Sequence, residues 1–284
     1  MWYADCVGAV LGLSRFFVMI GGKRMKLWVL AENTACREDM ISEHGLSLYI
    51  ETGEHKILFD MGQSHAFARN AECMGIDLAQ ADLAVLSHGH YDHGGGLAAF
   101  LEINSQAPVY MSPHAFQPHF NGQDKYIGLD TAFNNSDRIH FIGREEMIGD
   151  NLTLYSGEAL PCPYPFGNFG LTMEEVGMRK PDDFRHEQYL LIQEENKRIL
   201  ISGCSHKGIL NIAERFRPDV LIGGFHFMKM DPESEALSAA ANRLMTYHTR
   251  YFTGHCTGNQ QFAVLKKIMG DRLEAISTGA YFEV

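Results

Sequence analysis

The chain has 284 residues, of which 45% are hydrophobic and 21% are charged. This balance predicts a large buried core and excludes an intrinsically disordered polypeptide. A net charge of −11 without a basic stripe argues against a nucleic-acid partner. No run approaches the roughly 18 apolar residues of a membrane-spanning helix, so we expect no membrane partner. The expected partner is a small-molecule substrate, and nothing in the sequence sets the oligomeric state.

The six cysteines are scattered, without the close spacing of a disulfide scaffold. We therefore expect reduced thiols and a cytoplasmic location. Near the start, Asp5 precedes an apolar stretch and Arg15 interrupts it, unlike a secretory signal with a basic beginning. We expect residues 1–24 to be an N-terminal extension and residues 25–284 to form one domain, because no linker divides them.

The expected elements change in character along the chain. In the first part of the chain, apolar patterning predicts strands at 26–31, 46–50 and 56–59, a helix at 64–74, a strand at 81–86, a short helix after 96 and a strand near 109. Four strands are predicted in the middle part, at 138–142, 152–156, 188–193 and 198–202. Helices and strands then alternate, with helices at 208–216, 233–247 and 259–269 and strands at 220–223, 250–253 and 273–277. Residues 112–137 lack periodicity and are expected to form a pocket loop. Early hairpins and late strand–helix units favour an α/β fold, a four-layer αββα sandwich.

The clearest chemical signal directly follows the strand expected at 81–86. It reads Ser87-His88-Gly89-His90-Tyr91-Asp92-His93-Gly94-Gly95-Gly96. Imidazole and carboxylate ligands together suit zinc, iron or manganese. A tight turn can aim His88 and His90 at one ion while Asp92 and His93 face an adjacent one. Four adjacent buried polar groups need partners that a metal readily supplies, so a packing role for all four is disfavoured.

Three further segments place a histidine near glycine just after an apolar strand. They are Gly203-Cys204-Ser205-His206, Gly223-Gly224-Phe225-His226 and Gly254-His255-Cys256-Thr257-Gly258. Strand ends that share one edge of a sheet are where a site gathers, and glycine permits close approach of the backbone. We expect these segments to contribute the remaining site residues.

The run from His88 to His93 resembles the defining motif of the metallo-β-lactamase superfamily, His-x-His-x-Asp-His, at every fixed position. Phe59-Asp60-Met61-Gly62 is similar to the early aspartate–glycine turn of the same family. The resemblance covers residues 25–284 and implies the metallo-β-lactamase sandwich. It also implies two divalent transition-metal ions. Zinc is the metal expected first, with iron or manganese as alternatives. Asp60 would orient ligands, and His255 would bind the second metal.

Two ligand positions stay open. The superfamily usually has a metal-bridging Asp where this chain has Cys204, and His206 follows two residues later. A Cys204 thiolate would favour zinc, whereas His206 would give a nitrogen-rich site that also suits iron or manganese. For the third ligand of the first metal, the local choices are His186 and Glu187.

The glycine-rich segments resemble the branch named for a dihydropterin ribofuranosyl-aminobenzene phosphate synthase, a likeness that informs the scaffold more than the substrate. As a hydrolase, the protein would use metal-bound water, with its pKa lowered to about 7, as a hydroxide nucleophile. Asp92 and His226 are the expected catalytic residues, with His226 protonating the leaving group. Phosphoesters are the first expected substrates, followed by thioesters and lactones. The alternatives are a di-iron redox protein, a pterin-related synthase and a non-catalytic metal-binding sensor.

Aromatic residues in two loop segments are candidates for the walls of a substrate pocket. They are Phe116, Phe120, Tyr126 and Phe133 in the first segment, and Tyr164 and Phe166 in the second.

Overall fold

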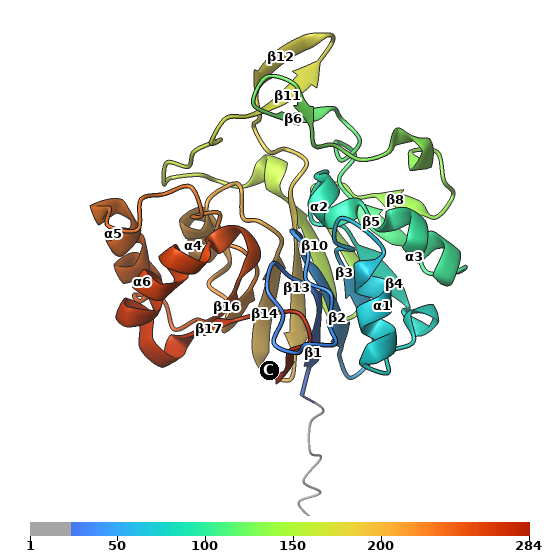
Figure 1. Cartoon of the computed structure of the whole chain (residues 1–284), viewed down its shortest axis with the longest axis horizontal. Coiled ribbons are helices and arrows are strands. Elements are labelled where there is room, and N and C mark those ends of the chain that lie inside the picture. Colours follow the sequence, from blue (N-terminus) through green and yellow to red (C-terminus); the bar gives the residue numbers. More distant parts are fainter. Residues whose placement is uncertain (1–23) are drawn as a thin grey trace, which may run out of the picture.

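The computed structural model describes residues 24–284, so the expected extension at 1–24 lies outside the described residues except for Arg24. Two seven-stranded sheets pack face to face, with helices on the outer side of each (Figure 1). The first sheet has the order β18 (Tyr281–Glu283), β1 (Lys26–Ala31), β2 (Ser47–Glu51), β3 (Lys56–Phe59), β4 (Leu83–Val85), β5 (Val109–Met111) and β8 (Ile139–Phe141). The second has the order β17 (Leu273–Ala275), β16 (Arg250–Thr253), β15 (Val220–Ile222), β14 (Lys197–Ser202), β13 (Gln188–Glu194), β10 (Leu152–Ser156) and β9 (Glu145–Gly149). The predicted αββα sandwich is confirmed.

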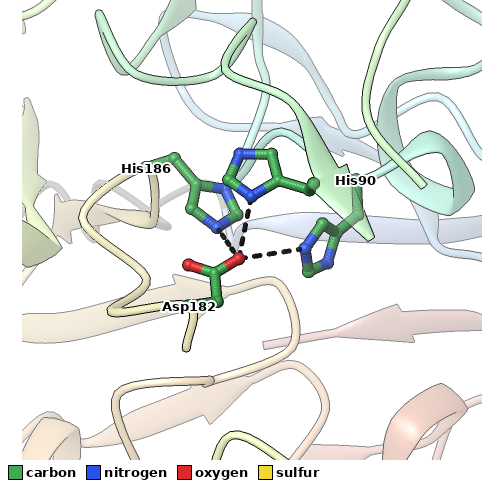
Figure 2. A group of neighbouring side chains, drawn as sticks. His90, Asp182 and His186 are labelled. Atoms are coloured by element: carbon green, nitrogen blue, oxygen red, sulfur yellow. Dashed lines mark hydrogen bonds and ion pairs between the residues drawn. The ribbon is translucent and has the colours of Figure 1, made fainter. Parts of the chain in front are cut away.

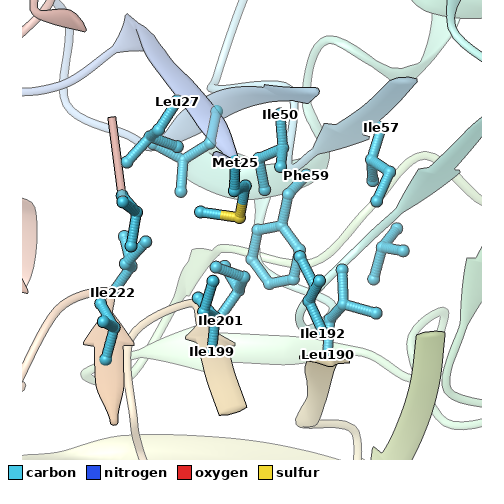
Figure 3. Close-up of a cluster of buried hydrophobic side chains, with 14 of the residues drawn as sticks. Met25, Leu27, Ile50, Ile57, Phe59, Leu190, Ile192, Ile199, Ile201 and Ile222 are labelled. Atoms are coloured by element: carbon cyan, nitrogen blue, oxygen red, sulfur yellow. The ribbon is translucent and has the colours of Figure 1, made fainter. Parts of the chain in front are cut away.

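The main core fills the space between the two sheets. Figure 3 shows Leu27 and Phe59 of the first sheet meeting Ile199 and Ile201 of the second. Successive residues of a strand point to opposite faces. Leu200 accordingly points the other way, into the core beneath the helices. Each of these side chains is at most 1% exposed, and full burial of such a side chain stabilises the fold by roughly 1.5–3 kcal/mol.

Helices form the two outer layers (Figure 1). On the side of the first sheet lie α1 (Ala66–Cys73), α2 (Tyr91–Gly94) and α3 (Leu97–Ile103), and on the side of the second lie α4 (Ile209–Phe216), α5 (Glu235–Leu244) and α6 (Asn259–Met269). Their apolar faces bury Phe67 and Phe100 in one layer and Ile212 and Leu265 in the other. No helix within residues 24–284 is long and apolar enough to cross a bilayer.

A small third sheet lies beyond one end of the sandwich (Figure 1). Its order is β12 (Met178–Pro181), β11 (Leu171–Glu175), β6 (His119–Asn121) and β7 (Lys125–Tyr126). The segment at 112–137, expected to be a pocket loop, does line a cavity through Asn121, Lys125 and Ile127, but it also contains β6 and β7, and none of the four strands of this sheet was predicted. These strands are short and partly exposed, and they are held by pairing with one another, so local periodicity carries little trace of them. The edge strands β9 and β18 were missed as well.

Parallel pairing determines where the functional loops emerge. β3 is parallel to β4 in the first sheet, and β14, β15 and β16 are mutually parallel in the second. The carboxyl ends of parallel strands lie at the same edge of a sheet. The segments after these five strands, which begin at residues 60, 86, 203, 223 and 254, therefore come together at one end of the sandwich.

Candidate metal centre

The structure gathers the predicted ligand residues into one buried cluster. Each is at most 9% exposed, and together they are His88, His90, Asp92, His93, Cys204, His206 and His255. They come from the segments that follow β4, β14 and β16, with Asp92 and His93 in the short helix α2. The sheet topology thus brings together side chains that lie far apart in the sequence.

One half of the cluster is made of three imidazoles. His88 Nε2 lies 3.3 Å from His206 Nε2. The His90 ring lies 4.6 Å from the ring of His88 and 4.9 Å from that of His206, between centroids. Donor atoms of these three residues lie within 4.8 Å of one another, so together they could hold one ion.

The other half combines imidazoles, a carboxylate and a thiol. His93 Nε2 lies 3.2 Å from His255 Nε2 and 3.2 Å from Cys204 Sγ. Asp92 Oδ2 lies 3.4 Å from His255 Nε2. Cys204 groups with His88 and His93, with His206 and His226, and with His255 and Cys256, which places its sulfur at the junction of the two halves. Both residues that the sequence left as alternatives lie in the cluster, with His206 in one half and Cys204 beside the other.

These spacings fit transition-metal ions. An ion with tetrahedral geometry and bonds to nitrogen of about 2.0–2.1 Å holds its nitrogen ligands about 3.3 Å apart. The nitrogen pairs in the two halves are separated by 3.3 Å and 3.2 Å. Buried lone pairs that face one another at this distance need a proton or a cation between them.

Asp60 orients one histidine in each half. Its Oδ2 accepts from His93 Nδ1 at 2.6 Å and from Ser87 Oγ at 2.8 Å. Ser87 Oγ is also 2.8 Å from His88 Nδ1. Because Nδ1 of both rings is engaged on this side, Nε2 of both is directed into the cluster. The structure thus gives Asp60 the orienting position that the resemblance implied.

The electrostatics of the cluster favour a cation. Burial and the neighbouring imidazoles hold the pKa values of His88 and His206 well below the usual range, so their lone pairs are free at neutral pH. For His93, burial alone would lower the pKa, but the adjacent Asp60 carboxylate raises it to about 9. In the absence of metal, His93 therefore carries a proton that an incoming ion must displace.

Four of the nine described residues that have a side chain and a positive φ lie in the loops around the cluster. Asp60, Ser205, His226 and His255 have φ values of 59°, 60°, 56° and 48°, in the left-handed region that residues with a side chain rarely adopt. Such conformations persist where the surrounding structure fixes them, typically at functional sites. Gly203 meets a related constraint, because a Cβ there would lie 2.1 Å from Ser87 Oγ.

The two local choices for the third ligand, His186 and Glu187, are engaged elsewhere. Glu187 Oε1 accepts from the backbone N–H of His206 at 2.7 Å, and its Oε2 accepts from that of Lys207 at 3.0 Å. Glu187 therefore holds the loop that presents His206. His186 Nδ1 accepts from the backbone N–H of Gly89 at 2.9 Å, which leaves the ring proton on Nε2. His206 is the third imidazole beside His88 and His90, whereas His186 lies in a separate buried group with His90, His119 and Asp182.

A second buried network, which sequence reasoning missed, lies behind His90 (Figure 2). Asp182 Oδ2 accepts from His119 Nδ1 at 2.8 Å and lies 3.4 Å from His186 Nε2 and 3.9 Å from His90 Nε2. Burial alone would raise the pKa of Asp182, but the neighbouring imidazoles hold it well below the usual range. An ionised Asp182 favours the His90 tautomer that is protonated on Nε2, which leaves the lone pair of Nδ1 free for a metal.

Three further contacts to the cluster were not predicted. His44 Nε2 lies 3.3 Å from Asp92 Oδ2. Asn33 Oδ1 accepts from His255 Nδ1 at 2.8 Å, and Glu32 Oε1 accepts from the His255 backbone N–H at 2.5 Å. These residues come from the segment between β1 and β2. No local motif marks them, because Glu32 and Asn33 contact His255 more than 200 positions away and His44 contacts Asp92 of a different loop.

Two cavities adjoin the cluster and share His206 and His226 as walls. A cavity of about 130 Å³ opens over Asp92, Cys204 and His255, with the side chains of Lys125 and Lys229 also lining it. A neighbouring cavity of about 400 Å³ is lined by aromatic residues that include Tyr164 and Phe166. Phe120 and Tyr126, also predicted as wall residues, pack edge to face in the small sheet, with ring centroids 5.4 Å apart.

Comparison with known proteins agrees with this geometry. A family model described as the metallo-beta-lactamase superfamily matches residues 43–167. The crystal structure of Tm1679, described as a metal-dependent hydrolase of the beta-lactamase superfamily, is 30% identical and superposes with a TM-score of 0.78, over 92% of this chain and 99% of that one. The chain therefore belongs to the metallo-β-lactamase superfamily.

Two further relatives add detail. A 7,8-dihydropterin-6-methyl-4-(beta-D-ribofuranosyl)-aminobenzene-5'-phosphate synthase from Methanocaldococcus jannaschii is 29% identical over 264 residues, which cover 82% of this chain and 88% of that protein. The Zn(2+)-bound PqqB of Methylobacterium extorquens superposes with a TM-score of 0.56 at 12% identity, over 91% of this chain and 100% of that one. At that identity the likeness shows the shared fold alone.

Proposed function

We propose that the chain is a two-metal hydrolase of small-molecule phosphoesters, with residues 25–284 as its catalytic unit. The supporting observation is that seven buried donor residues converge in one cluster, and that five of them line a cavity. His88, His90 and His206 would hold one ion. Asp92, His93 and His255 would hold the other, with Cys204 at the junction. When bound, such ions polarise a phosphoryl oxygen and lower the pKa of water.

Zinc is the first metal we expect, because imidazole and thiolate ligands both suit it, and iron or manganese are the alternatives. The free thiols of Cys204 and Cys256 suit a reducing compartment, which supports our expectation of a cytoplasmic location.

Charge at the cavity favours an anionic substrate. Lys125 and Lys229 line the space above the cluster. Lys229 Nζ donates to the Phe169 backbone carbonyl at 2.8 Å, which ties the lysine to the cavity wall. The chain has a net charge of −11, so the two lysines that line this cavity give a local attraction for a phosphate group. For this reason we place phosphoesters ahead of thioesters and lactones.

Two residues are assigned roles in proton transfer and orientation. Burial alone would raise the pKa of Asp92, but the neighbouring His255 and His44 hold it well below the usual range, so Asp92 is ionised. Its carboxylate can bind an ion and accept a hydrogen bond from the attacking water. The His226 ring lies beside that of His206, with centroids 4.3 Å apart, on the wall common to both cavities. This location supports His226 as the donor of a proton to the leaving group.

Metal content and an ester panel test the proposal together. Purified protein is analysed for zinc, iron and manganese, and then assayed on p-nitrophenyl phosphate, bis(p-nitrophenyl) phosphate, an acyl thioester and a lactone. We expect phosphoester cleavage that is lost when His88 and His90 are both changed to Ala. His248→Ala, at an exposed position outside the cluster, is the matched control and keeps activity. Cleavage that persists without the metal ligands would refute the proposal.

A synthase that acts on a pterin-bearing phosphate is the second candidate, supported by the Methanocaldococcus jannaschii relative that matches over 88% of its length. A redox function has less support. A relative named anaerobic nitric oxide reductase flavorubredoxin, from Aliivibrio fischeri, matches over 86 residues, or 16% of that protein. Two irons with visible absorption would favour redox chemistry, whereas metal binding without turnover of any ester would favour a sensor.

A further inference from the structure

The cavity of about 400 Å³ beside the metal centre takes no part in the proposed chemistry. It lies between the segment at 164–169, the start of α4 and the first turns of α5. The described residues that line it include no Lys, Arg, Asp or Glu. Aromatic rings supply much of its wall, from Tyr164, Phe166, Phe169, Phe225 and Phe227. Such a surface binds an apolar group better than it binds water.

The apolar cavity and the metal centre are neighbours that share two side chains. His206 belongs to the three-imidazole half of the cluster, and His226 is the proposed proton donor. Phe169 packs against His226 with ring centroids 5.2 Å apart, and Phe184 stacks on His206 at 4.5 Å. A substrate whose reacting group sits over the ions therefore has an aromatic-lined space immediately beyond its leaving-group side.

We propose that the substrate is an aryl-bearing phosphoester whose ring system, of two fused or linked rings, occupies this cavity. The inference rests on the proposed function and names the substrate class for that same site. An apolar cavity of roughly 150 Å³ takes up benzene, so a cavity of about 400 Å³ has room for more than one ring. Aromatic walls favour a flat ring through edge-to-face and offset contacts, which a flexible alkyl chain cannot make.

Three phosphonates that differ only in their organic group test the proposal by binding. Methylphosphonate, hexylphosphonate and 1-naphthylmethylphosphonate are titrated into the metal-loaded protein by calorimetry. We expect the naphthyl compound to bind at least tenfold more tightly than methylphosphonate and more tightly than the hexyl compound. Equal affinity of the naphthyl and methyl compounds would overturn the proposal. A preference for hexylphosphonate would overturn it too, because it would indicate an acyl-chain pocket.

A pair of substitutions on α5 ties the preference to this cavity. Ala236 is exposed and lines the cavity, whereas Ala239 is exposed on the same helix and is not among the lining residues. Ala236→Trp places an indole in or over the cavity and should abolish the preference for the naphthyl compound. Ala239→Trp has the same bulk and should keep it. Both variants should retain metal content and affinity for methylphosphonate, since neither position contacts the cluster.

The binding test separates this inference from the proposed function. If the wild type prefers the naphthyl compound and Ala236→Trp loses that preference, the aryl cavity stands even when no ester in the panel is cleaved. If phosphoesters are cleaved but Ala236→Trp retains the full preference for the naphthyl compound, the hydrolase assignment stands. The assignment of this cavity as the aryl-binding site is then wrong.

Discussion

His206 Nε2 lies 3.3 Å from His88 Nε2, although the two residues are 118 positions apart in the chain. The loop after β14 thus supplies a side chain to each half of the cluster, with Cys204 at the junction and His206 facing His88. Glu187 fixes this loop in position, because its carboxylate accepts hydrogen bonds from the backbone N–H groups of His206 and Lys207.

The thiol of Cys204 is predicted to bind metal, whereas that of Cys256 is not. Cys204 Sγ lies 3.2 Å from His93 Nε2, while Cys256 Sγ faces the Cys204 backbone carbonyl at 3.4 Å. Cys204→Ser should weaken binding at the second site and reduce the preference for zinc, because a thiolate is a softer ligand than a hydroxyl. Cys256→Ser, also at a buried position, is the control. Competition with a chelator measures the zinc and manganese affinities of both variants. Equal zinc affinities of Cys204→Ser and Cys256→Ser would show that the Cys204 thiol is only a packing group.

Asp182 is predicted to strengthen metal binding without touching the ion. Asp182→Asn removes the charge that favours the metal-binding tautomer of His90, and loss of such support typically lowers metal affinity about 10- to 100-fold. The neighbouring Asp183 offers a matched control, since its partly exposed carboxylate pairs with Arg185. Asp183→Asn should leave the affinity unchanged. If the two variants bind metal alike, Asp182 serves the fold and not the metal centre.

His226 is predicted to act on the substrate. His226→Ala should keep the full metal content, because the two halves of the cluster are complete without it, and should lose roughly a hundredfold or more in kcat, the usual scale for a general acid. The pH profile supplies a second readout, since removal of a general acid removes the loss of activity at high pH. A variant that loses metal would identify His226 as a ligand, and one with unchanged turnover would identify it as a packing residue.

Glu214 is predicted to make stability depend on acid pH. It joins α4 to α5, accepting from Tyr247 Oη at 2.6 Å and from Arg243 at 2.9 Å. The hydrogen bond from Tyr247, with the paired Arg217, lowers the pKa of Glu214 to about 2. The folded state therefore favours the ionised form, and this stabilisation is complete above about pH 4.5 and is lost as the pH falls toward 2. Urea unfolding should show Glu214→Gln less stable than wild type at pH 7, with the difference shrinking below pH 4.5. A constant difference down to pH 2 would contradict the assignment.

The layered fold was largely predictable because its elements carry strong local patterns. The strands at 152–156 and 250–253 and the helix at 259–269 agree with the structure at both ends. Each faces a core on at least one side, so hydrophobicity marks its length. β6, β7, β11 and β12 lack that signal, because they form a small sheet whose members have many exposed positions.

The candidate site was predictable only where ligands are close in sequence or follow a strand with glycine. His88 to His93 met the first condition, and His206 and His255 met the second. Asp182 and His44 met neither, since they reach the cluster from segments that only the tertiary fold brings near. The choice of Glu187 as a possible ligand failed for a related reason, because its carboxylate accepts backbone N–H groups that appear only once the loop after β14 is formed.

The most direct measurement is elemental analysis of metal-reconstituted wild type, His206→Ala and the exposed-site control His248→Ala. Two adjacent groups of ligands, with His206 in the first, predict two transition-metal ions per chain in the wild type and in the control, and about one in His206→Ala. A chelator should lower the unfolding temperature of the wild type and the control more than that of His206→Ala, because each bound ion stabilises the folded state. A wild type that binds no transition metal, or a His206→Ala variant that keeps both ions, would contradict the two-metal account.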